Sequence, residues 1–267
     1  FTCRFMKISF DKYHGCGNDF IIINNLSNTF PNTSKETIKN LCDRNLGIGA
    51  DGLILINECK NESFEMVYYN SDGKISTMCG NGGRCAMHYS SHNGISSNKS
   101  NFLACDGLHN GEVSNDYVRI SLQNVEGFKL INDDVFMDTG SPHIVKILKN
   151  IFDIDILKIS QDIQKSENFK STGVNVNFVS IINDKTIQIR TYERGVEDET
   201  LSCGTGAVAA ALTLSIVSNS DIKKVLVKTK GGDLFVEFKK DNNNFYDIYL
   251  SGKVKKVFSG NIDYEKN

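Results

Sequence analysis

Two cysteines stand in the same short motif at distant places in the chain. Cys79 begins the stretch CGNGG and Cys203 begins CGTGA, and a helix is predicted directly after each cysteine. A helix start carries unpaired N–H groups and roughly half a positive charge, which favour a thiolate over a thiol. The same N–H groups can hold a carboxylate, and the glycines let a ligand approach the backbone closely. Each motif therefore predicts a thiol beside an anion-binding helix start.

Two such thiols suit the inversion of a stereocentre. A thiolate would remove the α-proton of an amino acid from one face, and a thiol would deliver a proton to the other face. The helix starts would hold the substrate carboxylate while it gains enolate-like charge. This chemistry needs no cofactor, and we expect none.

Two other interpretations of the cysteines stay open from the residues alone. One is a redox disulfide between Cys79 and Cys203. The other is structural, because a buried cysteine is a small hydrophobic side chain and Gly-x-Gly can simply allow a tight turn into a helix.

The spacing around the two cysteines is repeated along the chain. With the cysteines aligned at an offset of 124 residues, three further landmarks fall into nearly constant register: Gly49 and Gly173 (30 residues before the cysteine), Gly107 and Gly231 (28 after), and Asn18 and Ser141 (61 and 62 before). We interpret the repeat as two homologous halves, 1–130 and 131–267, which meet near the acidic stretch INDDV. The last residues of the chain can pack back on the first half.

Each half has the same order of predicted elements. The segments EMVYYN and IQIRTY predict strands, and each leads through a turn to its cysteine motif and helix. The second helix, AVAAALTLSIV, is apolar on nearly every side, which indicates burial all round. The alternating segments YVRISL and LFVEF follow as strands. We therefore predict an α+β fold of two pseudo-symmetric domains, each a mixed β-barrel-like roll around a central helix, with the active site in the cleft between them.

The composition argues against several function classes. The 267 residues are 40% hydrophobic and 23% charged, with a formal net charge of −2. Such a weak net charge argues against nucleic acid as a partner. The longest apolar run is too short to span a bilayer, and the amino terminus lacks the apolar centre of a secretory signal. We therefore expect a cytoplasmic chain without a nucleic-acid or membrane partner.

Three other motifs do not point to function. The eight cysteines include no C-x-x-C pair, so we expect most of them to be reduced and structural. His88 and His92 lie one helical turn apart without a third ligand nearby, which favours a solvated helix face over a metal site. GIGADG matches the dinucleotide pattern, but a predicted helix precedes it and a predicted strand follows, which is the reverse of the order that NAD binding needs.

Seven segments together resemble the diaminopimelate epimerase family, and they cover nearly the whole chain from Met6. The combination of MCGNG with YERG and CGTG is the most specific part. Proline racemases share the cysteine pair but usually have histidine where this chain has Asn81, and phenazine-type isomerases lack the paired cysteines. The matching segments are KYHGCGNDFIIIN, RNLGIGADGLILI, YYNSDGKISTMCGNGGRC, TGSPHIV, GVNVNF, TYERGVEDETLSCGTGA and KTKGGDLFVEF.

The resemblance implies interconversion of LL- and meso-2,6-diaminopimelate without pyridoxal phosphate or a metal, on the route to lysine and peptidoglycan. It implies that Cys79 and Cys203 are the acid/base pair. It assigns the other site residues to three groups: His143 and Glu193 near the reacting centre; backbone N–H groups around Gly80, Asn81, Gly204 and Thr205 for the reacting carboxylate; and Asn18, Asn70, Asn175, Glu193 and Arg194 for the substrate's amino and carboxylate groups.

The chemistry of the substrate agrees with these assignments. Diaminopimelate is a double zwitterion, so the planar fork of Arg194 suits a carboxylate and Glu193 suits an ammonium group. Two positions depart from the family pattern. Ser141 replaces the asparagine that many relatives have in GNPH, and Gly52 replaces a glutamine that some carry. Both changes affect substrate contacts and leave the cysteine chemistry intact.

Two alternative functions follow from the same residues. One is a racemase for a cyclic amino acid such as proline, although Asn81 and the Glu193–Arg194 pair disfavour it. The other is a thiol redox or binding protein that keeps the fold without the chemistry. As partners we expect a small amino-acid substrate and, through an exposed strand edge, a second copy of the chain in a homodimer.

Overall fold

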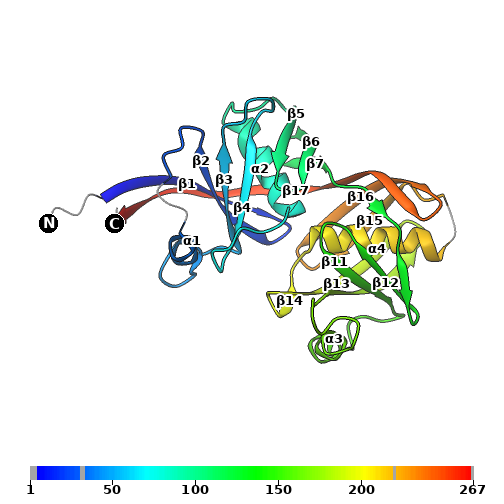
Figure 1. Cartoon of the computed structure of the whole chain (residues 1–267). Coiled ribbons are helices and arrows are strands. Elements are labelled where there is room, and N and C mark those ends of the chain that lie inside the picture. The colour runs from blue at the N-terminus through cyan, green and yellow to red at the C-terminus, as the bar shows by residue number, and fades with distance from the viewer. Residues whose placement is uncertain (1–4, 31–33, 219–220, 266–267) are drawn as a thin grey trace. The chain divides into compact units, whose positions relative to one another are not determined.

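The computed structural model describes residues 5–30, 34–218 and 221–265. The chain divides into two compact units, which Figure 1 traces from the N-terminus to the C-terminus. The first unit holds the described residues up to Ile120 and those from Val254 onward, and the second unit is Ser121–Lys253. No helix in the described part of the chain is long and apolar enough to cross a membrane.

The first unit is a mixed sheet with two helices. β2 and β3 are parallel, β3 and β4 antiparallel, β4 and β5 parallel, and β5, β6 and β7 antiparallel. β1 pairs in antiparallel fashion with β2 and with the last part of β17. The elements are β1 (Phe5–Gly15), β2 (Asn18–Asn25), α1 (Lys35–Cys42), β3 (Gly52–Asn57), β4 (Glu65–Asn70), α2 (Gly80–His92), β5 (Lys99–Ala104), β6 (Gly107–Ser114) and β7 (Tyr117–Ser121).

The second unit repeats this succession. β11 and β12 are parallel, β12 and β13 antiparallel, β13 and β15 parallel, and β15, β16 and β17 antiparallel. The elements are β8 (Val125–Glu126), β9 (Lys129–Ile131), β10 (Asp134–Asp138), β11 (Pro142–Ile147), α3 (Ile156–Gln164), β12 (Asn175–Asn183), β13 (Thr186–Glu193), β14 (Asp198–Thr200), α4 (Gly204–Val217), β15 (Lys224–Thr229), β16 (Gly232–Asp241) and β17 (Asn244–Glu265). The predicted α+β class, with a mixed sheet in each of two related units, is confirmed.

One helix in each unit packs against several strands. α2 contacts β1, β2, β3, β4 and β6, and α4 contacts β10 to β13, β15 and β16. Every residue of α4 from Ala207 to Ser215 is buried. The buried Thr213 hydroxyl donates to the Ala209 carbonyl, which satisfies it inside the apolar environment. The prediction of a helix buried all round is confirmed.

The prediction of a solvated face at His88 and His92 is wrong for His88. The His88 side chain is buried, and its ring stacks on His92 with centroids 3.9 Å apart. The ring of Tyr13 from β1 covers it edge-on at 5.6 Å. The prediction failed because β1 packs on the helix face that the spacing of the two histidines predicted to be exposed to solvent. Among the described residues there is no group of His, Cys, Asp and Glu that could hold a metal ion.

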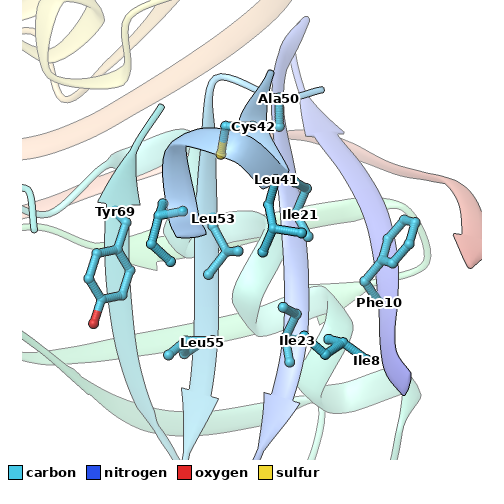
Figure 2. Close-up of a cluster of buried hydrophobic side chains, with 11 residues drawn as sticks. Ile8, Phe10, Ile21, Ile23, Leu41, Cys42, Ala50, Leu53, Leu55 and Tyr69 are labelled. Atoms are coloured by element: carbon cyan, nitrogen blue, oxygen red, sulfur yellow. The ribbon is translucent and has the colours of Figure 1, made fainter. Parts of the chain in front are cut away.

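The two remaining helices cover sheet faces, and each begins at a side-chain cap. Ser34 caps α1 and Asp155 caps α3, each by accepting from a backbone N–H in the first turn. Under α1, buried side chains of β1 to β4 form an apolar cluster with the helix residues Leu41 and Cys42 (Figure 2). The GIGADG segment connects α1 to β3. The reversed order of helix and strand there is thus confirmed.

The core of the second unit gives a stability prediction. Phe178 of β12 is fully buried in an apolar cluster with Ile144, Phe169 and Tyr192. Phe178→Ala is expected to lower the free energy of unfolding by about 3–5 kcal/mol, because the lost apolar contacts leave a cavity. Urea unfolding of this variant and of Phe152→Ala measures the effect. Phe152 is 61% exposed, so equal losses in the two variants would contradict the prediction.

Candidate active site

Cys79 is the N-cap of α2. Its backbone is extended, with φ −106° and ψ 116°, and its Sγ accepts from the Gly82 N–H at 3.5 Å. The first helical bond runs from the Gly83 N–H to the Cys79 carbonyl. The N–H groups of Gly80 and Asn81 precede that bond, so the helix itself does not use them. The predicted thiol at a helix start is present.

Asn18 contacts this thiol, and Asn81 contacts Asn18. Asn18, at the start of β2, accepts with Oδ1 from the Cys79 Sγ–H at 3.6 Å and from Asn81 Nδ2 at 3.3 Å. Its Nδ2 donates to Asp51 Oδ2 at 2.7 Å. The structure therefore brings Cys79, Asn18 and Asn81 together, and it adds Asp51, which the sequence did not single out.

An ionic network holds Asp51 in place. Arg44 donates to Asp51 Oδ1 at 2.7 Å and to both oxygens of Asp19, and the buried Lys12 pairs with Asp19. Burial alone would raise the pKa of Asp19, but the hydrogen bonds from Arg44 and Lys12 outweigh it and hold that pKa well below its usual range. Asp51 thus belongs to the same charged cluster as Asp19, with Arg44 bound to both carboxylates.

Cys203 is the N-cap of α4 in the same backbone conformation, with φ −114° and ψ 118°. Its side chain is buried, and its Sγ lies 3.4 Å from Thr205 Oγ1. Thr205 Oγ1 lies 2.9 Å from Nε2 of the fully buried His143. The first helical bond again skips the N–H groups of Gly204 and Thr205, since it runs from Ala207 to the Cys203 carbonyl. The two motifs therefore have the same local structure.

Asn177 contacts the ring of His143, and the sequence analysis did not single it out. Its Nδ2 lies 3.0 Å from His143 Nδ1 and 3.2 Å from the Ile144 carbonyl oxygen. Its Oδ1 accepts from the Thr191 hydroxyl at 3.0 Å. The alternation of β12 places Asn175 and Asn177 on one face of the strand, which is the signal that could have pointed to Asn177.

The other predicted residues of the second unit cluster at the ends of β11, β12 and β13. Asn175 Nδ2 donates to Ser141 Oγ at 2.8 Å, and Asn175 Oδ1 accepts from the Arg194 N–H at 2.9 Å. The Arg194 guanidinium is exposed and donates to the Thr172 carbonyl. Glu193, at the end of β13, accepts from the Thr200 hydroxyl at 2.5 Å. Ser141, Asn175 and Arg194 are thus directly linked.

Asn70 and Gly52 of the first unit lie opposite each other on neighbouring strands. Asn70 ends β4 opposite Gly52, and its side chain is exposed to solvent. A side chain at Gly52 would overlap the ring of Tyr68 and the carbonyl of Tyr69. The Tyr68 ring thus occupies the space that a glutamine at position 52 would need, which explains why glycine fits there.

The burial of His143 predicts a pH effect on stability. Burial, with a smaller contribution from Arg194, lowers the pKa of His143 to about 3. As the pH falls below the unfolded value of about 6.5, the unfolded chain takes up a proton that the native chain does not bind, so folding loses stability. Between pH 7 and pH 4.5, the free energy of unfolding of His143→Gln should therefore fall by about 2–3 kcal/mol less than that of the wild type. Parallel curves of unfolding free energy against pH would contradict this.

Comparisons with known proteins match this chain to one family over most of its length. The sequence profile described as diaminopimelate epimerase matches residues 10–118 and 135–257. A diaminopimelate epimerase of Flavobacterium psychrophilum is 44% identical over 252 residues, covering 94% of this chain and 98% of that protein. A diaminopimelate epimerase of Aquifex aeolicus is 35% identical over 280 residues, covering 97% of this chain and 99% of that protein.

Solved structures at low sequence identity share the fold. A phenazine biosynthesis protein of the PhzF family from Bacillus anthracis gives a TM-score of 0.76 at 12% identity, covering 96% of this chain and 99% of that one. A hydroxyproline epimerase from Agrobacterium vitis, with bound trans-4-hydroxy-L-proline, gives 0.74 at 11% identity, covering 99% and 93%. At these identities the likeness concerns the fold alone.

Proposed function

The chain belongs to the diaminopimelate epimerase family, and we propose that it interconverts LL- and meso-2,6-diaminopimelate without pyridoxal phosphate. One observation supports this most directly. The two units share a strand succession, and each holds a cysteine in the same backbone conformation at the start of a buried helix. The product places the enzyme in the synthesis of lysine and peptidoglycan precursors.

The proposed reaction is two proton transfers at one α-carbon, and it requires both thiols to reach the bound substrate. One cysteine thiolate takes the α-proton, so a C–H bond breaks and an S–H bond forms. The other thiol gives its proton to the opposite face, so an S–H bond breaks and a C–H bond forms. No electrons are exchanged, and the next turnover can run in reverse from the new protonation state. The α-carboxylate gains negative charge during the reaction, which the N–H groups at the two helix starts can stabilise.

The proposed substrate contacts follow from the polar groups around the two thiols. The N–H groups of Gly80, Asn81, Gly204 and Thr205 would hold the reacting carboxylate. The exposed guanidinium of Arg194 suits the distal carboxylate, and the carboxylate of Glu193 suits an ammonium group or the reacting centre. The neutral imidazole of His143 would act near the reacting centre. Amides and one hydroxyl would complete the contacts, from Asn18, Asn70, Asn175 and Ser141.

Two further parts of the proposal concern the setting of the enzyme. We propose a cytoplasmic location, because its substrate is an intermediate of amino-acid synthesis. We also propose a homodimer. Val257 and Phe258 on β17 are 52% and 46% exposed, and such side chains are common at contacts between subunits. The molar mass in solution, measured by light scattering, tests the dimer.

A panel of single stereoisomers tests the reaction. Purified enzyme with a reducing agent is incubated separately with LL-diaminopimelate, meso-diaminopimelate, L-proline and trans-4-hydroxy-L-proline, and the products are resolved by chiral chromatography. We expect conversion of the two diaminopimelates to a common mixture and no conversion of the cyclic amino acids. Conversion of proline with no conversion of diaminopimelate would contradict the proposed substrate.

A further inference from the structure

We infer that Glu197 is a positioning residue, whose carboxylate sets the guanidinium of Arg194 in place before a substrate carboxylate binds. Both residues belong to the turn 194–197, which joins β13 to β14. The Glu197 carboxylate holds the main chain of this turn, and the neighbouring segment 172–175 holds the side chain of Arg194. The inference rests on the proposed function, in which Arg194 binds the distal carboxylate of diaminopimelate.

The backbone of Glu197 is strained. Its φ is 60°, in the left-handed region that residues other than glycine, asparagine and aspartate rarely adopt. The Glu197 N–H donates to the Glu193 carbonyl at 2.8 Å, which closes the turn in this conformation. A strained residue persists where its surroundings hold it, and such residues gather at functional sites. The side chain of Glu197 supplies the contacts that offset this strain.

The Glu197 carboxylate connects the turn to the core of the second unit. Its Oε1 accepts from the Gly195 N–H at 2.8 Å, and its Oε2 accepts from the Tyr192 hydroxyl at 2.7 Å. The Tyr192 ring is buried in an apolar cluster, so its hydroxyl is a fixed donor. The hydrogen bonds from Gly195 and Tyr192 lower the pKa of Glu197, and burial raises the pKa of Tyr192 to about 12. At neutral pH a carboxylate therefore accepts from a neutral phenol, which is a charge-assisted hydrogen bond.

Arg194 lies against the segment 172–175. Its backbone N–H donates to Asn175 Oδ1 at 2.9 Å, and its Nη1 donates to the Thr172 carbonyl at 2.8 Å. Gly173 leaves room for the side chain, since a Cβ at that position would lie 2.6 Å from Arg194 Cδ. A guanidinium has five N–H groups, so this exposed one can bind the Thr172 carbonyl and still reach a carboxylate of the substrate.

The segment 172–175 is anchored independently of the turn. Gln164, the last residue of α3, donates from Nε2 to the Val174 carbonyl at 3.0 Å and accepts with Oε1 from the Val174 N–H at 2.9 Å. The Gly173 N–H also donates to the Phe169 carbonyl at 2.7 Å. The surface under Arg194 is therefore held by α3 and its following residues, whereas the turn is held by Glu197. Loss of the Glu197 carboxylate should release the main chain of Arg194 from this surface.

Glu193 depends less on the turn than Arg194 does. It ends β13, where it pairs with Asp198 of β14, and its Oε1 accepts from the Thr200 hydroxyl at 2.5 Å. The pairing of the two strands therefore supports its position. A change at Glu197 should act on the contact of Arg194 with the distal carboxylate and spare the contact of Glu193.

A double-mutant cycle of Glu197→Gln and Arg194→Met, measured by steady-state kinetics with LL-diaminopimelate, tests the inference. Glutamine keeps the length of the side chain and the strain of the backbone, and it removes the charge. We expect Glu197→Gln to raise KM about tenfold and to change kcat by less than about twofold, because only binding of the distal carboxylate is affected. The double variant should have the kcat/KM of Arg194→Met alone, since Glu197 acts through the guanidinium. Tyr192→Phe keeps the buried ring and should raise KM in the same way by a smaller factor.

The matched control is Asp198→Asn, which removes the next carboxylate along the chain. Asp198 Oδ1 accepts from the Glu199 N–H at 2.7 Å, a bond that lies outside the turn 194–197 and that asparagine can still accept. The KM of this variant should equal that of the wild type. Hydrogen exchange of residues 193–198, followed by mass spectrometry without substrate, is a second readout. Exchange should be faster in Glu197→Gln and unchanged in Asp198→Asn.

The possible results separate the inference from the proposed function. A double variant with a kcat/KM well below that of Arg194→Met would overturn the inference, because Glu197 would then act through another group. Unchanged hydrogen exchange of the turn in Glu197→Gln would overturn it as well. A wild type that does not epimerise diaminopimelate, but whose turn exchanges faster in Glu197→Gln, would contradict the proposed function and support the positioning by Glu197.

Discussion

Cys79→Ala and Cys203→Ala are each expected to lower the rate of epimerisation by about a thousandfold or more. Alanine can neither take nor give a proton, and inversion needs one acid/base group on each face of the α-carbon. Cys79→Ala loses the cap bond from the Gly82 N–H, which costs about 1 kcal/mol, and Cys203 makes no side-chain cap bond, so the fold should survive both changes. The rate of LL-to-meso conversion, with circular dichroism as a check on folding, measures the effect.

Cys105→Ala is the control for these variants. Cys105 is an exposed free thiol whose Sγ contacts the Ser76 carbonyl, and it lies outside the two motifs. The epimerase activity of the Cys105→Ala variant should equal that of the wild type. Activity near the wild-type level in either Cys79→Ala or Cys203→Ala would exclude the mechanism with two thiols.

Arg194→Met is expected to lower kcat/KM for diaminopimelate by about a hundredfold, which corresponds to the loss of charge-assisted hydrogen bonds to a carboxylate. The effect should lie mainly in KM, because the distal carboxylate does not take part in the chemistry. Arg194→Lys should recover part of the loss, since it keeps the charge but not the planar fork. Steady-state kinetics of the three proteins provides the measurement.

The matched control is Lys170→Met, another exposed cation of the second unit, which pairs with Glu167. Its kinetics should not change. The guanidinium of Arg194 is also exposed, so neither substitution should change the free energy of unfolding by more than about 0.5 kcal/mol. Unaltered kinetics in Arg194→Met would remove this residue from the substrate contacts.

Local sequence patterns were sufficient to predict the central features of each half. The pattern of a strand, a turn, a cysteine motif and an apolar helix is contained within about 30 residues, and Cys79 and Cys203 are the helix caps that it predicts. The glycine spacing is also local, and Gly49 and Gly173 both have a positive φ, of 79° and 67°. Residue type and position along the chain therefore specify these features directly.

The residues behind the thiols could not be predicted in the same way. Asn177 reaches His143 because β11 and β12 pair in parallel with His143 opposite Asn175, and that register depends on the whole sheet. Asp51 reaches Asn18 because β2 and β3 are neighbours, with Phe20 opposite Gly52. Neither pairing has a signature in the sequence of a single strand.

The burial of His88 has a similar cause. A sequence pattern treats both histidines, one helical turn apart, as polar. Only the position of β1 shows that the Tyr13 ring covers one of them. The burial of His88 depends on contacts between elements that are distant in sequence, whereas the elements themselves depend on local propensity and spacing.

Proton NMR of LL-diaminopimelate in D₂O with the reduced enzyme tests the central claim most directly. The account predicts that the α-proton signal disappears with enzyme turnover while the meso form accumulates with deuterium at the inverted centre. Cys79→Ala and Cys203→Ala should prevent the formation of the meso form. An unchanged α-proton signal with wild-type enzyme whose thiols are shown to be free would contradict the account.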